Sequence, residues 1–155
     1  MTPVETLARC PLFQDFTDTG LRIVASIAQE RSLPEGAPIF VEGMLGDSLY
    51  VVRTGRVGRG LPGADGKVRS PVSLGEGEAF GELSLVTPEV PRLVSAVAET
   101  AVELLEIRYR DFARLQTQKP QACLKLVLAI AGTFGKRLSG NRETFRELLV
   151  PAARR

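Results

Sequence analysis

Short apolar runs separated by glycines fill the middle of the chain and predict a β-rich region. Eleven of the 15 glycines lie between Gly36 and Gly81. The runs that we expect to form strands lie at 39–41, 49–53, 67–72, 95–98 and 102–107. Frequent turns between such short runs are typical of a small antiparallel barrel or roll rather than a parallel sheet. Residues 62–66, which combine proline, glycine and aspartate, predict a hairpin tip.

Helical patterns precede this β-rich region. Thr2 can cap a first helical turn, Pro3 suits its first position and Glu5 can reach back to the cap. A second helix is predicted from about Asp18 to Glu30, because apolar residues recur there on one face. We therefore expect residues 1–30 to be helical.

The pattern after residue 107 is helical again and carries a heptad repeat. We expect a short helix at 109–118 and a long one from 120 to about 149. In the long helix, spacings of three and four alternate along one seam, made of Leu124, Val127, Ala131, Phe134, Leu138, Asn141, Phe145 and Leu148. The first half of this seam is expected to pack on the roll. The second half suits the same helix of a second copy, with Asn141 fixing the register of a parallel homodimer.

The composition is that of an ordinary soluble domain. The 155 residues suffice for one domain with a core, and 44% hydrophobic and 25% charged residues are usual for a globular protein. The most apolar stretch, 124–134, contains Lys125 and is far shorter than the roughly 20 residues that span a membrane. The N-terminus lacks a signal pattern. We therefore expect a cytoplasmic protein that does not enter a membrane.

The absence of histidine removes the commonest general base and metal ligand. The chain has two cysteines, too few for a disulfide scaffold or a metal cluster, and no nucleophile motif or paired carboxylates. We expect no enzyme, no catalytic residues, no metal site and no cofactor.

Charge is distributed unevenly along the chain. Residues 1–107 hold 9 Lys/Arg and 15 Asp/Glu, a net charge of −6, whereas residues 108–155 hold 11 and 3, a net charge of +8. The basic part could meet nucleic acid or an acidic partner. It could equally be a solvated helix face that complements the acidic body.

The strongest candidate for chemistry is the run at 80–85, Phe-Gly-Glu-Leu-Ser-Leu, which is followed by Pro91 and Arg92. Gly81 lets the backbone approach a ligand closely, and a helical turn that starts there would present free N–H groups to an anion. Glu82 can accept a hydrogen bond from a sugar hydroxyl. The planar fork of Arg92 matches two phosphate oxygens. This combination suits a small anionic sugar phosphate.

The run resembles the phosphate-binding cassette of the cyclic nucleotide-binding domain family, the module of the catabolite activator protein and of the regulatory subunit of cyclic AMP-dependent protein kinase. The segments 11–13, 36–40 and 42–43 resemble the entry helix and early strands of that family. The segments 46–52 and 55–57 resemble its Gly-Asp…Tyr…Gly-x-Val signature. The resemblance covers most of the chain.

The resemblance implies a single α+β domain over 1–155, with an antiparallel β-roll of the jelly-roll or double-stranded β-helix type. It divides the chain into helices at 1–30, a roll at 31–107 with a phosphate-binding turn at 80–93, and helices at 108–149. It implies cyclic AMP or cyclic GMP as ligand. The expected phosphate and ribose contacts are Gly81, Glu82, Leu83, Ser84, Arg92 and Leu93. The expected base contacts are Arg59, Val72, Leu74, Asn141 and Arg142.

Leu93 departs from the family pattern, because a small or hydroxylated residue usually follows the arginine. One hypothesis is a stand-alone sensor, dimeric through its C-terminal helix, that signals by moving this helix against a separate protein effector. The alternative is a degenerate domain that binds no nucleotide and acts as a structural or protein-interaction module. No effector domain or helix-turn-helix is expected within the chain. Because Glu143 and Glu147 interrupt the cations of the last helix, we expect no sequence-specific nucleic-acid binding.

Overall fold

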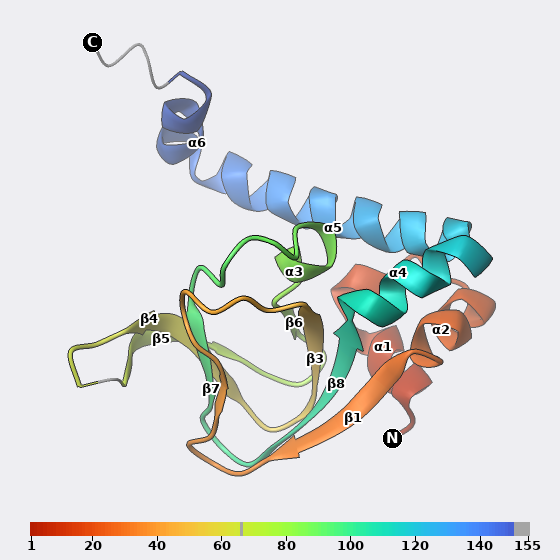
Figure 1. The fold of residues 1–155 in the computed structure, drawn as a ribbon, viewed down its shortest axis with the longest axis horizontal. Helices are drawn as coiled ribbons and strands as arrows, with labels where there is room; N and C mark the ends of the chain where they lie inside the picture. Colours follow the sequence, from red (N-terminus) through yellow and green to blue (C-terminus); the bar gives the residue numbers. More distant parts are fainter. Residues whose placement is uncertain (66, 151–155) are drawn as a thin grey trace.

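The computed structural model describes residues 1–65 and 67–150, and it contains two facing antiparallel sheets with helices packed against one of them (Figure 1). The strand orders are β1-β8-β3-β6 and β2-β7-β4-β5. The strands are β1 (Ala28–Leu33), β2 (Pro38–Phe40), β3 (Ser48–Thr54), β4 (Val57–Pro62), β5 (Val68–Leu74), β6 (Ala79–Phe80), β7 (Ser95–Ala98) and β8 (Val102–Arg108). This architecture confirms the predicted α+β class with an antiparallel roll.

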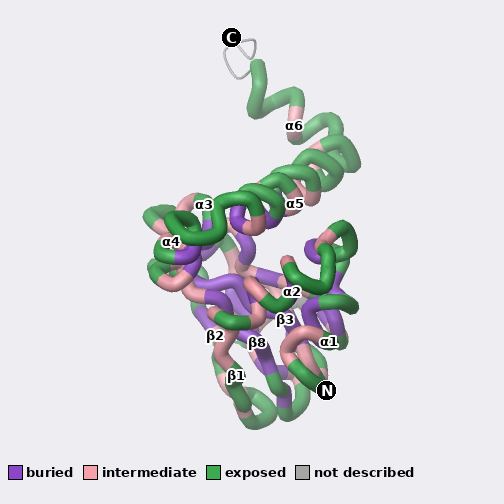
Figure 2. Tube along the Cα trace, turned by 90° about the vertical axis from the view of Figure 1, so that its right-hand side faces the viewer, coloured by how far each residue is buried: buried purple, intermediate pink, exposed green. Residues whose placement is uncertain are grey.

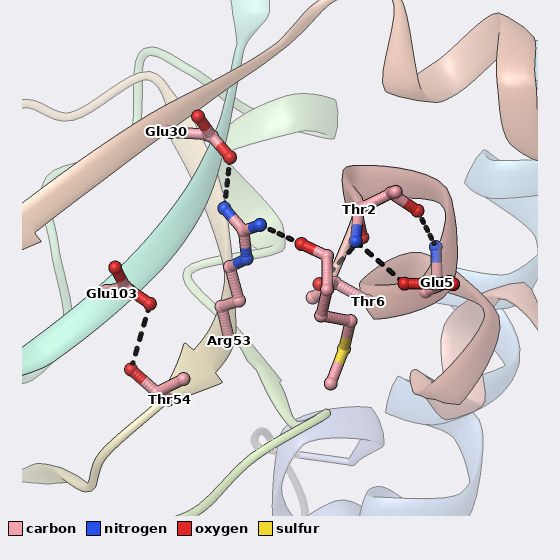
Figure 3. Close-up of polar contacts among 8 residues, drawn as sticks. Thr2, Glu5, Thr6, Glu30, Arg53, Thr54 and Glu103 are labelled. Atoms are coloured by element: carbon pink, nitrogen blue, oxygen red, sulfur yellow. Dashed lines mark hydrogen bonds and ion pairs between the residues drawn. The ribbon is translucent and has the colours of Figure 1, made fainter.

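The helices lie mainly at the two ends of the sequence. They are α1 (Pro3–Arg9), the 3-10 turn η1 (Pro11–Phe13), α2 (Asp18–Ala25), α3 (Leu83–Val86), α4 (Tyr109–Gln118), α5 (Pro120–Gly140) and α6 (Arg142–Leu149). The predicted start of α1 is confirmed. The Thr2 hydroxyl accepts from the Glu5 N–H at 3.1 Å, and the Glu5 carboxylate accepts from the Thr2 N–H at 2.8 Å (Figure 3).

The prediction of a helix from Asp18 to Glu30 is wrong at its C-terminal end. Helix α2 stops at Ala25, and β1 begins at Ala28. All six residues of β1 pair with β8, from Ala28 opposite Ile107 to Leu33 opposite Val102. Pairing along a whole strand therefore outweighs a local helical pattern, whose propensities are weak.

An arginine of the inner strand β3 reaches across β8 to the edge strand β1. Arg53 of β3 donates to the carboxylate of Glu30 on β1 and to the carbonyl of Met1 (Figure 3). Close by, the Thr54 hydroxyl donates to Glu103 on β8 at 3.3 Å. These contacts fasten the N-terminus to the sheet.

Two apolar cores lie on opposite faces of the β1-β8-β3-β6 sheet. Tyr50 and Val52 point into the roll between the sheets, whereas Leu49 and Val51 point toward the helices. Side chains alternate along a strand, so a strand covered on both faces is a continuous apolar run. Figure 2 shows this buried interior beneath the more exposed α5 and α6.

The C-terminal helix is broken, contrary to the prediction of one helix from 120 to 149. Helix α5 ends at Gly140, and Asn141 leaves the helical region with φ −123° and ψ 59° (Figure 1). The Asn141 side chain donates to the Arg137 carbonyl at 2.9 Å. Glycine is a poor helix former, and an asparagine that bonds to nearby backbone competes with the helical pattern.

The predicted seam also divides between two faces of α5. Val127 and Phe134 pack against the helical core. Leu124 and Leu128 are 58% and 62% exposed, and with the exposed Ala131 they form an outward apolar line at a spacing of four and three. Within the described part of the chain, no helix is both long and apolar enough to cross a membrane.

Candidate functional site

A cavity of about 280 Å³ lies between the short helix α3, the loop before β7 and the middle of α5. Helix α5 passes across α3 at this place (Figure 1). The cavity is lined by Phe40, Arg59, Gly81, Glu82, Leu83, Ser84, Thr87, Val90, Pro91, Arg92, Leu93, Val94, Phe134 and Arg137. Its walls are mostly apolar, with a few charged groups that converge on it, as expected for a small-molecule site.

Two glycines make the space that Arg92 occupies. Gly81 has φ +74°, and a Cβ there would lie 2.8 Å from Nη1 of Arg92 and 3.0 Å from the Ser48 carbonyl oxygen. A Cβ at Gly46 would lie 2.1 Å from Nε of Arg92. The glycines of the 46–52 and 80–85 segments thus serve one purpose, which is to let an arginine lie against the backbone.

Arg92 is a buried cation without a carboxylate partner among the described residues. Its side chain donates to the carbonyls of Ser48 at 3.1 Å and Gly81 at 3.4 Å, and its guanidinium lies 4.1 Å from the ring centroid of Phe40. The residue is 7% exposed, and Nε has no hydrogen-bond partner within the described chain. Burial lowers the pKa of Arg92, against the opposing effect of Tyr50 and nearby carboxylates. A buried charge is costly unless paired, so this site suits an anion.

The turn beside Arg92 supplies further donors. The N–H groups of Ser84 and Leu85 donate to the carbonyls of Gly81 and Glu82 and so close the turn. The first N–H groups of such a turn have no partner within it, and they add a partial positive charge beside Arg92. Both Glu82 and Ser84 are buried.

Glu82 connects this turn to the C-terminal helix. Its Oε1 accepts a hydrogen bond from Nη1 of Arg137 at 2.9 Å. Glu82 is 4% exposed, while Arg137 reaches it from α5 with its guanidinium 5.5 Å from the ring of Phe134. The ion pair therefore joins two residues that line the cavity and connects the expected ribose contact to α5.

A buried carboxylate, Glu106, is linked to Arg92 through Ser48. Glu106 accepts hydrogen bonds from the Ser48 hydroxyl at 2.6 Å and from Arg31 at 2.7 Å. Burial would raise the pKa of Glu106, but these hydrogen bonds and the Arg31 charge outweigh it, so the pKa is lowered. Because the Ser48 carbonyl also holds Arg92, this network positions the arginine.

All the predicted phosphate and ribose residues line the cavity, and so does Arg59. The other predicted base contacts lie elsewhere. Val72 is 56% exposed on β5, and Leu74 is buried in the core between the sheets. Asn141 and Arg142 are exposed at the junction of α5 and α6, outside the lining.

The sequence prediction missed Phe40, Thr87, Val90, Pro91, Val94, Phe134 and Arg137, which also line the cavity. Arg137 had one available signal, because it follows Phe134 by three positions and both therefore lie on the body-facing side of α5. Leu93 is 64% exposed, so its side chain lies at the rim of the cavity rather than deep beside Arg92.

Comparison with known proteins agrees with this geometry. A family model described as the cyclic nucleotide-binding domain matches residues 30–119. The cyclic AMP receptor protein of Thermus thermophilus is 36% identical over 121 residues, which are 78% of this chain and 56% of that protein. The chain thus spans little more than half of this relative.

Two solved structures have the same fold. The N-terminal domain of a transcriptional regulator from Streptomyces coelicolor is 32% identical with a TM-score of 0.75, covering 85% of this chain and 94% of that one. The regulatory domain of Toxoplasma gondii PKA, co-crystallised with cAMP, is 28% identical with a TM-score of 0.63, covering 73% of this chain and 42% of that one. Because the family model matches more than half of the chain and includes the roll and the α3 turn, the chain belongs to the cyclic nucleotide-binding domain family.

Proposed function

We propose that the protein is a regulatory module that binds a cyclic mononucleotide, cyclic AMP or cyclic GMP, in the cavity between α3 and α5. The observation that carries this proposal is Arg92, a buried guanidinium whose Nε has no partner within the described chain. The Thermus relative is named for cyclic AMP, and the Toxoplasma structure contains it. We expect regulation rather than catalysis.

In this proposal Arg92 and the first N–H groups of the α3 turn hold the cyclic phosphate. The Ser84 hydroxyl is a further donor that lines the cavity. Leu93 contributes its backbone N–H and not its side chain, which is 64% exposed. The loss of a hydroxyl at position 93 therefore removes one donor without filling the phosphate site.

Glu82 is the acceptor for the ribose 2′-hydroxyl, and its carboxylate also accepts a hydrogen bond from Arg137 at 2.9 Å. A nucleotide that hydrogen-bonds to Glu82 competes with Arg137 for the same carboxylate. Binding thereby changes the position that α5 prefers, because a ligand shifts an equilibrium only through contacts that differ between two states. This is how occupancy would reach the C-terminal helix.

The exposed apolar line of Leu124, Leu128 and Ala131 on α5 suits a second copy of the helix. We therefore propose a symmetric homodimer, since a two-fold axis pairs the same surface of both copies and leaves no such surface open for a third copy. A separate protein effector would sense the helix position. We expect no sequence-specific DNA binding, because α5 is packed on the body and Glu143 and Glu147 interrupt the cations of the exposed helix α6.

The test is a calorimetric titration with cyclic AMP and cyclic GMP, alongside thermal unfolding. A ligand at 100 times its Kd stabilises the folded state by about 2.7 kcal/mol, which a melting curve resolves. Saturable binding of either nucleotide supports the proposal. No binding of either at millimolar concentration overturns it and favours the degenerate, structural module.

A further inference from the structure

Exposed apolar side chains gather beside the cavity, on the loops that precede β3 and β7. Two backbone hydrogen bonds of 2.8 Å join these loops, from the Gly43 N–H to the Arg92 carbonyl and from the Arg92 N–H to the Met44 carbonyl. The side chains therefore lie close together on the surface, where contiguous apolar groups mark an interaction site. We name this surface the rim patch, and it consists of Val41, Met44, Leu45, Val90 and Leu93, which are 38–69% exposed.

Helix α6 exposes an apolar face of its own. Phe145, Leu148 and Leu149 are three and four positions apart and therefore lie on one side of the helix. Leu148 and Leu149 are 65% and 66% exposed, and no residue of α6 is buried. A helix of only eight residues is marginally stable alone, so its apolar face needs a surface to pack on.

The junction between α5 and α6 keeps this face away from the rim patch of the same chain. Only Asn141 separates the two helices, whereas helices that fold back on each other need a loop of about 2–5 residues. Asn141 is held to the end of α5, because its N–H donates to the Leu138 carbonyl at 3.1 Å and its side chain donates to the Arg137 carbonyl at 2.9 Å. In both views α6 lies beyond the end of α5, on the side away from the sheets (Figures 1 and 2). The surface that covers α6 therefore has to come from another molecule.

The charges around the two surfaces are complementary. Residues 41–47 and 86–91 contain three exposed carboxylates, Glu42, Asp47 and Glu89, and no lysine or arginine, a net charge of −3. The sequence from 142 to 155 contains four arginines and two glutamates, a net charge of +2. Opposite charges around an apolar centre fix the orientation of a contact and suppress wrong partners.

We propose that the rim patch binds α6 of a second copy of the chain, and that the exchange is reciprocal, with each α6 on the patch of the other copy. This contact adds to the pairing of the α5 helices and needs no bound nucleotide. It gives Leu93, which departs from the family pattern, a role as an apolar contact for the helix. Because Val90 and Leu93 also line the cavity, the α6 of one copy lies beside the nucleotide site of the other.

The experiment is sedimentation of the full chain carrying Leu45→Glu or Leu148→Glu, each alone and as an equimolar mixture. Each variant places a carboxylate in one of the two surfaces, so we expect the dimer dissociation constant to rise about tenfold or more. In the mixture one copy supplies an intact patch and the other an intact α6, so one of the two exchanged contacts forms again. The mixture should therefore associate more tightly than either variant alone. Leu61→Glu is the matched control and should leave the constant unchanged, because Leu61 is 57% exposed on β4 and lies outside the patch.

Three results would overturn the inference, provided that circular dichroism shows each variant to be folded. One is a mixture that associates no more tightly than the separate variants, which would exclude exchange between copies. Another is an equal dissociation constant for wild type, Leu45→Glu and Leu148→Glu; if Leu128→Glu still separates the copies, the α5 pairing stands and only this inference fails. The last is a wild type that is monomeric at tens of micromolar, which removes both contacts. Nucleotide binding is tested separately by the calorimetric titration.

Discussion

The ion pair between Glu82 and Arg137 is the contact through which the cavity acts on α5, and its removal gives a measurable stability change. Arg137→Ala leaves a carboxylate whose side chain is 5% exposed without its partner, whereas the arginine side chain was 45% exposed. Breaking a buried pair costs about 3–5 kcal/mol, and an exposed pair contributes about 0–1 kcal/mol. For this half-exposed pair we expect about 1–3 kcal/mol, which for a chain of this size lowers the melting temperature by about 2–12 °C.

The assay is urea unfolding of a double-mutant cycle made of Arg137→Ala, Glu82→Gln and the double variant. We expect a coupling energy of about 1 kcal/mol or more without ligand. With saturating cyclic nucleotide it should decrease, because the ribose hydroxyl takes part of the Glu82 interaction. Lys136→Ala, which removes the neighbouring exposed charge on α5, is the matched control. A coupling energy near zero, or one that ligand leaves unchanged, would refute the proposed link between the cavity and α5.

The remaining predictions concern the arginine pocket, the dimer and acid stability. Gly46→Ala places a Cβ 2.1 Å from Nε of Arg92 and should displace the guanidinium; calorimetry should show weaker nucleotide binding with the fold intact by circular dichroism, and unchanged affinity would contradict this. Leu128→Glu should convert a dimer into a monomer in sedimentation, and a wild type that is monomeric at tens of micromolar would disprove the dimer. The pKa of Glu106 is lowered in the folded state, so its stabilisation is present above its ordinary value of 4.5 and is lost as pH falls through the folded-state pKa. Urea unfolding between pH 7 and about 3 should therefore show a smaller acid-induced loss of stability in Glu106→Gln; identical pH profiles would count against this role.

The parts of the site that could be predicted from the sequence are those whose signal is local. Gly81, Glu82 and Ser84 belong to one short turn, and Arg92 follows it closely, so a single run of residues carries the motif. The contacts of Phe40 and Arg137 could not be found in this way. Glu82 and Arg137 are 55 positions apart, and Phe40 meets Arg92 only because β2 and the loop before β7 converge in the roll.

The errors in the predicted elements have the same origin. Residues 28–30 fit a helical pattern, but their backbone groups find partners along β8. The heptad spacing is present in the sequence of the last two helices, α5 and α6. It predicted that the first half of the seam would pack on the body, as Val127 and Phe134 do. It did not reveal that Leu124 and Ala131 would face outward, or that Gly140 and Asn141 would end α5. Tertiary contacts decide such cases, because local propensities amount to only a fraction of a kcal/mol per residue.

The decisive measurement is a calorimetric titration of wild type, Arg92→Ala and a control variant with cyclic GMP and cyclic AMP. The control is Arg110→Ala, which removes an exposed arginine of α4 outside the cavity lining. Arg92 is the cation that the cyclic phosphate would pair with, and leaving a desolvated anion without such a partner costs about 2–5 kcal/mol. We predict saturable binding to the wild type and to Arg110→Ala, and binding weakened more than about thirtyfold in Arg92→Ala. Equal affinity of wild type and Arg92→Ala, or no binding of either nucleotide to the wild type, would contradict the assignment of this cavity as a cyclic nucleotide site.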